Sequence, residues 1–134
     1  MITDRRTFLP CLNGAVVAVM RLLTGLAGPQ GEHRMYGLIA KLTAVPGKRD
    51  ELIKILKQGT RNMPGCRSYI LAKDAVDENI LWVTEIWDSE TSHDASLSLT
   101  AVKDTLTQAK PLIASFEKVA VTNPVGGVGF PPSN

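Results

Sequence analysis

Two side chains that can exchange protons, Glu85 and His93, follow each other closely in this sequence of 134 residues. His93 is the better candidate for a general base, because imidazole is the side chain that gains and loses a proton near neutral pH. A position on the surface near a helix N-terminus, with no role in catalysis, is the equally weighted alternative for this residue.

Glu85 alternates with apolar residues, so its side chain is expected to face the same apolar layer as that of Trp87. A carboxylate in such a layer is either paired with a cation or raised in pKa. We favour a structural salt bridge, for which the candidate partners are Lys41, Arg67 and Lys118. Trp87 is a candidate to flank an aromatic substrate, although core packing is the commoner role of a strand tryptophan. Glu85 and Trp87 complete the candidate catalytic set.

The candidate residues for contact with a substrate are Tyr69, Trp82, Ile39 and Phe116. Tyr69 and Trp82 suit either a pocket or an interface between subunits. Cys66 is the only cysteine after residue 11, so it has no partner for an internal disulfide, and no Cys/His cluster has the spacing of metal ligands. We therefore expect no metal site.

The elements that position these residues follow from hydrophobic periodicity. Alternation predicts strands at residues 36–43, 66–73, 80–87 and 116–122. Helical spacing of apolar residues predicts one helix from residue 49 or 50 to Met63, and a second helical region that begins after Ser89 and breaks near Ser98. Thr91 and Thr100 are the predicted helix caps.

Two strand–helix–strand halves, in the order β-α-β-β-α-β, predict an α+β fold of the ferredoxin-like kind. This fold has a four-stranded antiparallel sheet with both helices on one face. The strand at residues 80–87 is apolar on both faces, so the helix-free face also needs a cover. We expect a second subunit to provide it and the protein to be a homodimer.

The N-terminal residues 4–9, Asp-Arg-Arg-Thr-Phe-Leu, resemble a twin-arginine export signal, and an apolar segment continues to Ala27. This segment is too short and too polar for a membrane span. We predict a signal peptide at 1–27, a linker at 28–34, one domain at 35–123 and a Pro/Gly-rich tail at 124–134. The protein is then exported or periplasmic if the leader is used, and cytoplasmic otherwise. A misassigned start codon or a loosely attached amphipathic helix is the alternative.

Charge argues against a nucleic-acid partner. The chain has 15 Lys and Arg and 13 Asp and Glu, of which residues 1–27 hold three arginines and one aspartate. The remainder is neutral, and it has no basic stretch interleaved with aromatic residues.

Three short segments carry a family resemblance. Val45–Lys48 before the first helix, Met63–Cys66 before the second strand and Thr84–Ser89 at the end of the third strand are similar to the antibiotic biosynthesis monooxygenase domain family. The resemblance covers residues 35 to 122. It implies a dimeric α/β barrel, in which two ferredoxin-like subunits pack their sheets face to face and each has a pocket between sheet and helices.

The family includes monooxygenases that oxidise quinols or polyphenols with O2 and no cofactor, enzymes that cleave haem, and enzymes that process small signalling molecules. The positions that match the Asn, Trp and His shared by the haem-cleaving members are Ala40, Ser96 and Leu106, so haem degradation is disfavoured. Quinol-oxidising relatives often carry His where this chain has Ser96, and here His93 lies one helical turn earlier.

The resemblance therefore favours a cofactor-independent monooxygenase that acts on a small quinol or phenolic compound with O2. Two alternatives remain. One is a non-catalytic dimeric module that binds an apolar ligand, with haem as one possibility. The other is an isomerase of small molecules on the same fold.

Overall fold

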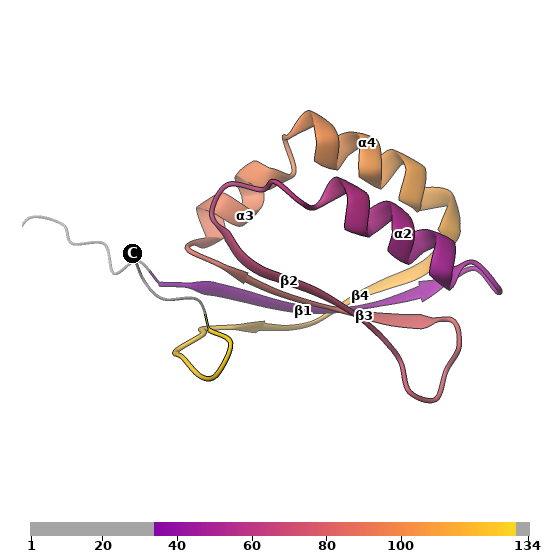
Figure 1. The fold of residues 1–134 in the computed structure, drawn as a ribbon, viewed down its shortest axis with the longest axis horizontal. Coiled ribbons are helices and arrows are strands. Elements are labelled where there is room, and N and C mark those ends of the chain that lie inside the picture. Colours follow the sequence, from indigo (N-terminus) through magenta and orange to yellow (C-terminus); the bar gives the residue numbers. More distant parts are fainter. Residues whose placement is uncertain (1–33, 131–134) are drawn as a thin grey trace, which may run out of the picture. The chain divides into compact units, whose positions relative to one another are not determined.

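The computed structural model describes residues 34–130, and Figure 1 shows their arrangement. The strands are β1 (Tyr36–Ala44), β2 (Cys66–Lys73), β3 (Ile80–Trp87) and β4 (Ile113–Thr122), and the helices are α2 (Arg49–Gly59), α3 (Glu90–Ser96), α4 (Thr100–Ala109) and the 3-10 turn η1 (Lys110–Leu112). The predicted signal peptide lies outside the described residues. The first part of the predicted tail, residues 124–130, contains neither helix nor strand.

The four strands form one antiparallel sheet in the order β2-β3-β1-β4. All helices lie on the same face of this sheet (Figure 1). The ferredoxin-like plan predicted from the sequence is therefore confirmed, with the second helical region divided into α3 and α4. The predicted bounds of β2 and β3 agree with the structure, and β4 begins three residues earlier than predicted.

The helices differ from the prediction in detail. α2 ends at Gly59 and does not reach Met63. Gly59 packs so closely against the side chain of Thr105 in α4 that a side chain at position 59 would not fit. The hydroxyl of Thr60 then donates to the carbonyl of Leu56 at 2.7 Å and closes the last turn. Thr100 is the first residue of α4 and makes no cap for it. The break near Ser98 is confirmed.

Ser89, and not Thr91, caps α3. Its hydroxyl oxygen accepts a hydrogen bond from the backbone N–H of Ser92 at 3.1 Å. This cap fixes the first turn of the short helix that carries His93, at the point where the chain leaves β3.

The core lies between the sheet and the helices in two clusters of buried residues. One surrounds Leu52, Leu56 and Leu81, and the other surrounds Leu38, Val102 and Trp87. Alternation along β3 sends Leu81, Val83, Glu85 and Trp87 to this helix-covered face, as predicted.

The other face of the sheet has no cover in the described part of the chain. Its apolar side chains are Ile39, Ile70, Ile80, Trp82 and Ile86. Ile70 is 56% exposed, and the remaining four are partly exposed. We call this surface the open face. No helix among residues 34–130 is long and apolar enough to cross a membrane.

Candidate active site

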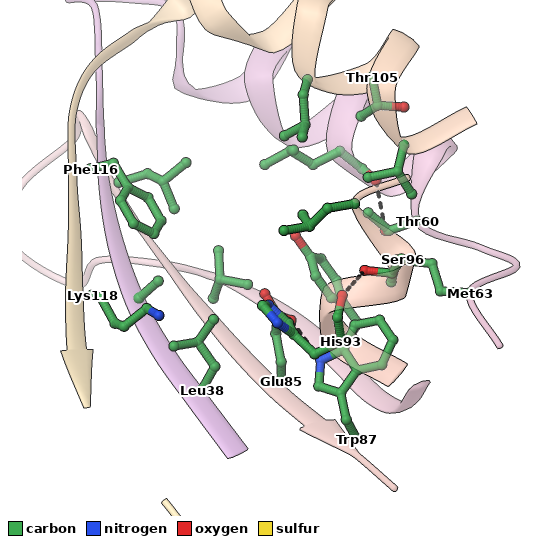
Figure 2. A pocket seen from close by; sticks show the side chains of 18 of the residues that line it. Leu38, Thr60, Met63, Glu85, Trp87, His93, Ser96, Thr105, Phe116 and Lys118 are labelled. Carbon is green, nitrogen blue, oxygen red and sulfur yellow. Dashed lines mark hydrogen bonds and ion pairs between the residues drawn. The ribbon is translucent and has the colours of Figure 1, made fainter. Parts of the chain in front are cut away.

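A cavity of about 580 Å³ lies between the helix-covered face of the sheet and the helices. Most of its lining is apolar and comes from β1, β3, α2 and α4, with Leu38, Leu56, Val83 and Val102 as examples. The charged or titratable groups in the lining, among the described residues, are Glu85, His93, Lys110, Lys118 and the Tyr69 hydroxyl. Figure 2 shows Glu85, His93 and Trp87 gathered at one end of this cavity. A largely apolar cavity with a few convergent polar groups is the usual form of a small-molecule site.

Glu85 is 9% exposed and accepts a hydrogen bond from the indole N–H of Trp87, with 2.7 Å between Nε1 and Oε2. The same carboxylate oxygen lies 3.9 Å from Nε2 of His93. Burial raises the pKa of Glu85, and the Trp87 hydrogen bond, His93 and Lys118 oppose that rise. The raised pKa agrees with one of the two expectations drawn from the sequence. The salt bridge that we favoured is wrong: no ion pair within 4.0 Å joins Glu85 to Lys41, Arg67 or Lys118, and the carboxylate instead accepts from Trp87 and lies beside His93.

The imidazole of His93 points into the cavity from α3 (Figure 2), and its side chain is only 13% exposed. Its other nitrogen, Nδ1, lies 3.1 Å from a carboxylate oxygen of Asp94. If Nδ1 carries the hydrogen and donates it to Asp94, Nε2 keeps its lone pair and faces Glu85, an assignment that rests on the hydrogen-bond network.

Two aromatic rings and one hydroxyl hold His93 in place. The imidazole lies 5.1 Å from the ring of Tyr36 and meets the ring of Trp87 edge-on at 5.5 Å. The buried Ser96 donates its hydroxyl hydrogen to the carbonyl of His93 at 2.6 Å. The alternative of an exposed helix-end residue therefore does not describe His93, although the nearby Asp94 is exposed.

The structure brings five of the seven candidate residues to this cavity: Tyr69, Glu85, Trp87, His93 and Phe116. Burial raises the pKa of the Tyr69 phenol well above its ordinary value, and the charge of Glu85 adds to the effect. Tyr69 therefore stays a neutral hydroxyl. Trp87 is 1% exposed and packs in the core while its ring also borders the cavity, so it fits both interpretations.

Ile39 and Trp82, the other two candidates, do not line this cavity. Each alternates with cavity residues along its strand and so points to the open face. The indole N–H of Trp82 donates to a carboxylate oxygen of Asp74 at 2.8 Å, and the Lys41 ammonium lies 6.0 Å from its ring centroid. Of the two places that the sequence left open for Trp82, the pocket is therefore ruled out, and its side chain lies on the open face.

Several lining residues were not among the candidates, notably Met63, Lys110 and Lys118. Asp94, which contacts His93 from outside the lining, was not a candidate either. Lys118 had a signal in the sequence, since it alternates with Phe116 on the last strand and so points to the same side. A β-bulge follows Lys118, because Ala40 pairs with Lys118 whereas the preceding Ile39 pairs with Ala120. Simple alternation therefore assigns the residues of β4 after the bulge to the wrong face of the sheet.

Neither a metal cluster nor a reactive thiol stands out in the described part of the chain. Among residues 34–130, no three His, Cys, Asp or Glu side chains lie close enough together to hold a metal ion. Burial and then the charge of Glu85 raise the pKa of the half-buried Cys66 to about 11, which suppresses its thiolate.

Similarity to known proteins identifies the family of this chain. A model of the family described as antibiotic biosynthesis monooxygenase matches residues 35–108. A search of curated proteins found no match.

Among solved structures, one from Chloroflexus aurantiacus J-10-fl that bears the same family name is 52% identical to this chain, with a TM-score of 0.70. The match covers 72% of this chain and 99% of that one. A structure from Caulobacter crescentus CB15, also bearing the family name, is 23% identical over 69% of this chain and 92% of its own, with a TM-score of 0.61. A conserved protein from Methanosarcina mazei Go1 is 20% identical over 68% of this chain and 93% of its own, also with a TM-score of 0.61. The last two show likeness of fold alone.

Proposed function

The chain belongs to the antibiotic biosynthesis monooxygenase family, and from this premise we propose that it is a cofactor-independent monooxygenase of a small phenol or quinol. The observation that carries the proposal is the pair formed by Glu85 and His93 at one end of an otherwise apolar cavity. Such an arrangement suits a reaction that begins with removal of a proton from an aromatic hydroxyl and continues where water is kept out.

In the proposed reaction, Nε2 of His93 takes the proton of the substrate hydroxyl. Asp94 holds Nδ1, and the carboxylate of Glu85, 3.9 Å from Nε2, stabilises the imidazolium that forms. This division of roles is that of an acid–base–orienter set, in which a carboxylate stabilises a histidine after it has accepted a proton. The hydrogen bond from Trp87 keeps Glu85 in a position to do so.

The resulting aryl anion is electron-rich enough to reduce O2 directly. For a naphthol, oxygenation at the ring carbon opposite the hydroxyl converts C–H to C=O, consumes one O2 and gives one naphthoquinone and one water. For a hydroquinone, oxygenation of a ring C–H likewise consumes one O2 and gives one hydroxyquinone and one water. Release of the unsubstituted quinone together with hydrogen peroxide would instead be the reaction of an oxidase. Tyr69 and Phe116 border the space in which the ring would lie.

We propose in addition that the protein is a homodimer formed through the open face. Five large apolar side chains share this face, and no helix of the described residues covers it. An uncovered apolar patch of this kind on a small domain is typical of an interaction surface.

The function is tested by O2 uptake. Purified protein, treated with EDTA and shown to be free of metal and flavin, should consume O2 with 1-naphthol or hydroquinone and release naphthoquinone or hydroxyquinone. One O2 per naphthoquinone without peroxide would identify monooxygenation. Loss of uptake after chelation, or no uptake over a panel of such compounds, would contradict the proposal. If the panel compounds bind without reacting, the non-catalytic binding module becomes the better description.

A further inference from the structure

Two lysines belong to the cavity lining in addition to the Glu85–His93 pair. Lys110 follows α4 and Lys118 lies on the edge strand β4, and they are the only ammonium groups in the lining formed by the described residues. Figure 2 shows Lys118 extending from β4 with its nitrogen toward the cavity, while Glu85 and His93 face it from the far side. The proposed proton transfer uses neither lysine.

The sheet register fixes the relation between Lys118 and Glu85. Ala40 of β1 pairs with Lys118 on one side and with Val83 on the other, while Leu38 pairs with Glu85. The Cα atoms of Lys118 and Glu85 are therefore separated by two strand spacings and one two-residue step, roughly 12 Å. Between them the floor is low, because Ala40 has only a methyl group. An aromatic ring above Ala40 would have the proton acceptor at one end and an ammonium group at the other.

The charge of Lys118 lowers the pKa of Glu85 across the cavity, but the two groups are not in contact. No ion pair within 4.0 Å joins either lysine to an acidic group in the described part of the chain. Glu85 is occupied by Trp87 and His93. An ammonium group beside an apolar lining gains most from an anionic partner brought by the ligand, because charge-assisted hydrogen bonds strengthen where water is displaced.

We propose, on the basis of the function proposed above, that the substrate is a hydroxyaryl acid whose carboxylate is bound by Lys118, assisted by Lys110. Its hydroxyl, at the opposite end of the ring system, then lies at His93. Lys118 and Lys110 determine specificity and take no part in the proton transfer.

The experiment compares a matched pair of ligands, 5-hydroxy-2-naphthoic acid and its methyl ester, by isothermal titration calorimetry with the wild-type protein. In both compounds the ring carbon opposite the hydroxyl carries a hydrogen, as the proposed oxygenation requires. The two have the same ring and hydroxyl and differ in the charge at the far end. The acid should bind roughly 10-fold more tightly than the ester, the size expected for one charge-assisted contact that is partly exposed. Lys118→Met should reduce this ratio to near one, and Lys118→Arg should keep most of it. Lys103→Met, at an exposed position of α4 outside the lining, is the control and should keep the full ratio.

Equal affinity for acid and ester in the wild type, or an unchanged ratio in Lys118→Met, would overturn the proposal. O2 uptake with the same two ligands separates this outcome from a failure of the proposed function. Oxidation of both compounds without preference for the acid leaves the monooxygenase standing and removes the charge recognition. Preferential binding of the acid without O2 uptake would support the charge recognition and contradict the monooxygenase. If neither compound binds, the proposal of a hydroxyaryl acid falls, and O2 uptake with 1-naphthol and hydroquinone still decides the proposed function.

Discussion

The two faces of β3 each place a tryptophan beside a carboxylate, and the two carboxylates respond in opposite ways. On the helix-covered face, Trp87 donates to Glu85 at 2.7 Å, and the pKa of Glu85 is raised. On the open face, Trp82 donates to Asp74 at 2.8 Å, and the pKa of Asp74 is lowered to about 2. The same indole hydrogen bond is present in both pairs, so it cannot be what decides the direction.

The surroundings decide it. Glu85 is buried, and the loss of water outweighs its hydrogen bond and the neighbouring charges. Asp74 lies in the turn between β2 and β3, where the backbone N–H groups of Val76 and Asp77 donate to it in addition to Trp82 and little desolvation opposes them. The hydrogen bonds of the turn thus stabilise Asp74 as the anion, whereas burial in the cavity favours the protonated form of Glu85. This difference supports Glu85 as a functional group.

The largest expected effect is on the helix-covered face. His93→Ala should lower the rate of O2 uptake by roughly 100-fold or more, the usual contribution of a general base. Added imidazole should restore part of the lost rate, because the cavity left by the side chain admits a free base. Thr91→Ala, at an exposed position of the same helix, is the control. A rate within a few-fold of wild type in His93→Ala would remove the histidine from the mechanism.

A charge placed on the open face should weaken the association of the two subunits. Ile39→Glu places a charge in the proposed interface of both subunits, since a two-fold axis repeats each substitution. Burying an unpaired charge costs several kcal/mol, so the dimer dissociation constant should rise by about 100-fold or more. Light scattering over a dilution series measures this.

Gln58→Glu adds the same charge on the exposed side of α2 and should leave the association unchanged. A wild-type protein that is monomeric at micromolar concentration, or an Ile39→Glu variant that remains as dimeric as wild type, would contradict the assignment of the open face to a dimer.

The sequence was sufficient to predict the fold because its periodicity is strong. The alternation in β3 placed Glu85 with Leu81, Val83 and Trp87, and the structure agrees. The same alternation should have separated Trp82 and Ile39 from the cavity residues, but aromatic or apolar character alone made them candidates. Which face of a sheet becomes a pocket depends on where the helices pack, and that is a tertiary property.

The partners of Glu85 were harder to predict. Lys41, Arg67 and Lys118 were selected as cations on neighbouring strands, whereas the carboxylate found an indole two residues away and a histidine on the following helix. The position of His93 depends on the Ser89 cap and on the short α3, whose geometry has no hydrophobic period to reveal it.

The stability of Glu85→Gln should depend on pH. Because the pKa of Glu85 is higher in the folded protein than its ordinary value of 4.5, the folded state binds the proton more tightly than the unfolded state. The contribution of this group to the free energy of unfolding is therefore full below pH 4.5 and is lost as the pH rises through the folded pKa. The difference in stability between Glu85→Gln and wild type should shift in favour of the variant over that range. Chemical denaturation at a series of pH values measures it, and a constant difference would show that Glu85 titrates normally.

Asp74→Asn should show the smallest effect, and with the opposite sign. The pKa of Asp74 falls from 3.8 to about 2 on folding, so its anion stabilises the folded state above pH 3.8, and that contribution is lost as the pH falls toward 2. Asparagine has no charge and keeps only one side-chain oxygen, which can accept from the turn N–H groups, while its NH2 group replaces the oxygen that accepts from Trp82. The variant should therefore melt at a lower temperature than wild type at pH 7, and the gap should narrow between pH 3.8 and 2 as Asp74 of the wild type loses its charge. Glu78→Gln removes a carboxylate of the same turn that accepts none of these hydrogen bonds, and it should change the melting temperature less. A gap that stays constant down to pH 2 would mean that the charge of Asp74 adds nothing to its hydrogen bonds. The two tryptophan–carboxylate pairs would then differ only in burial.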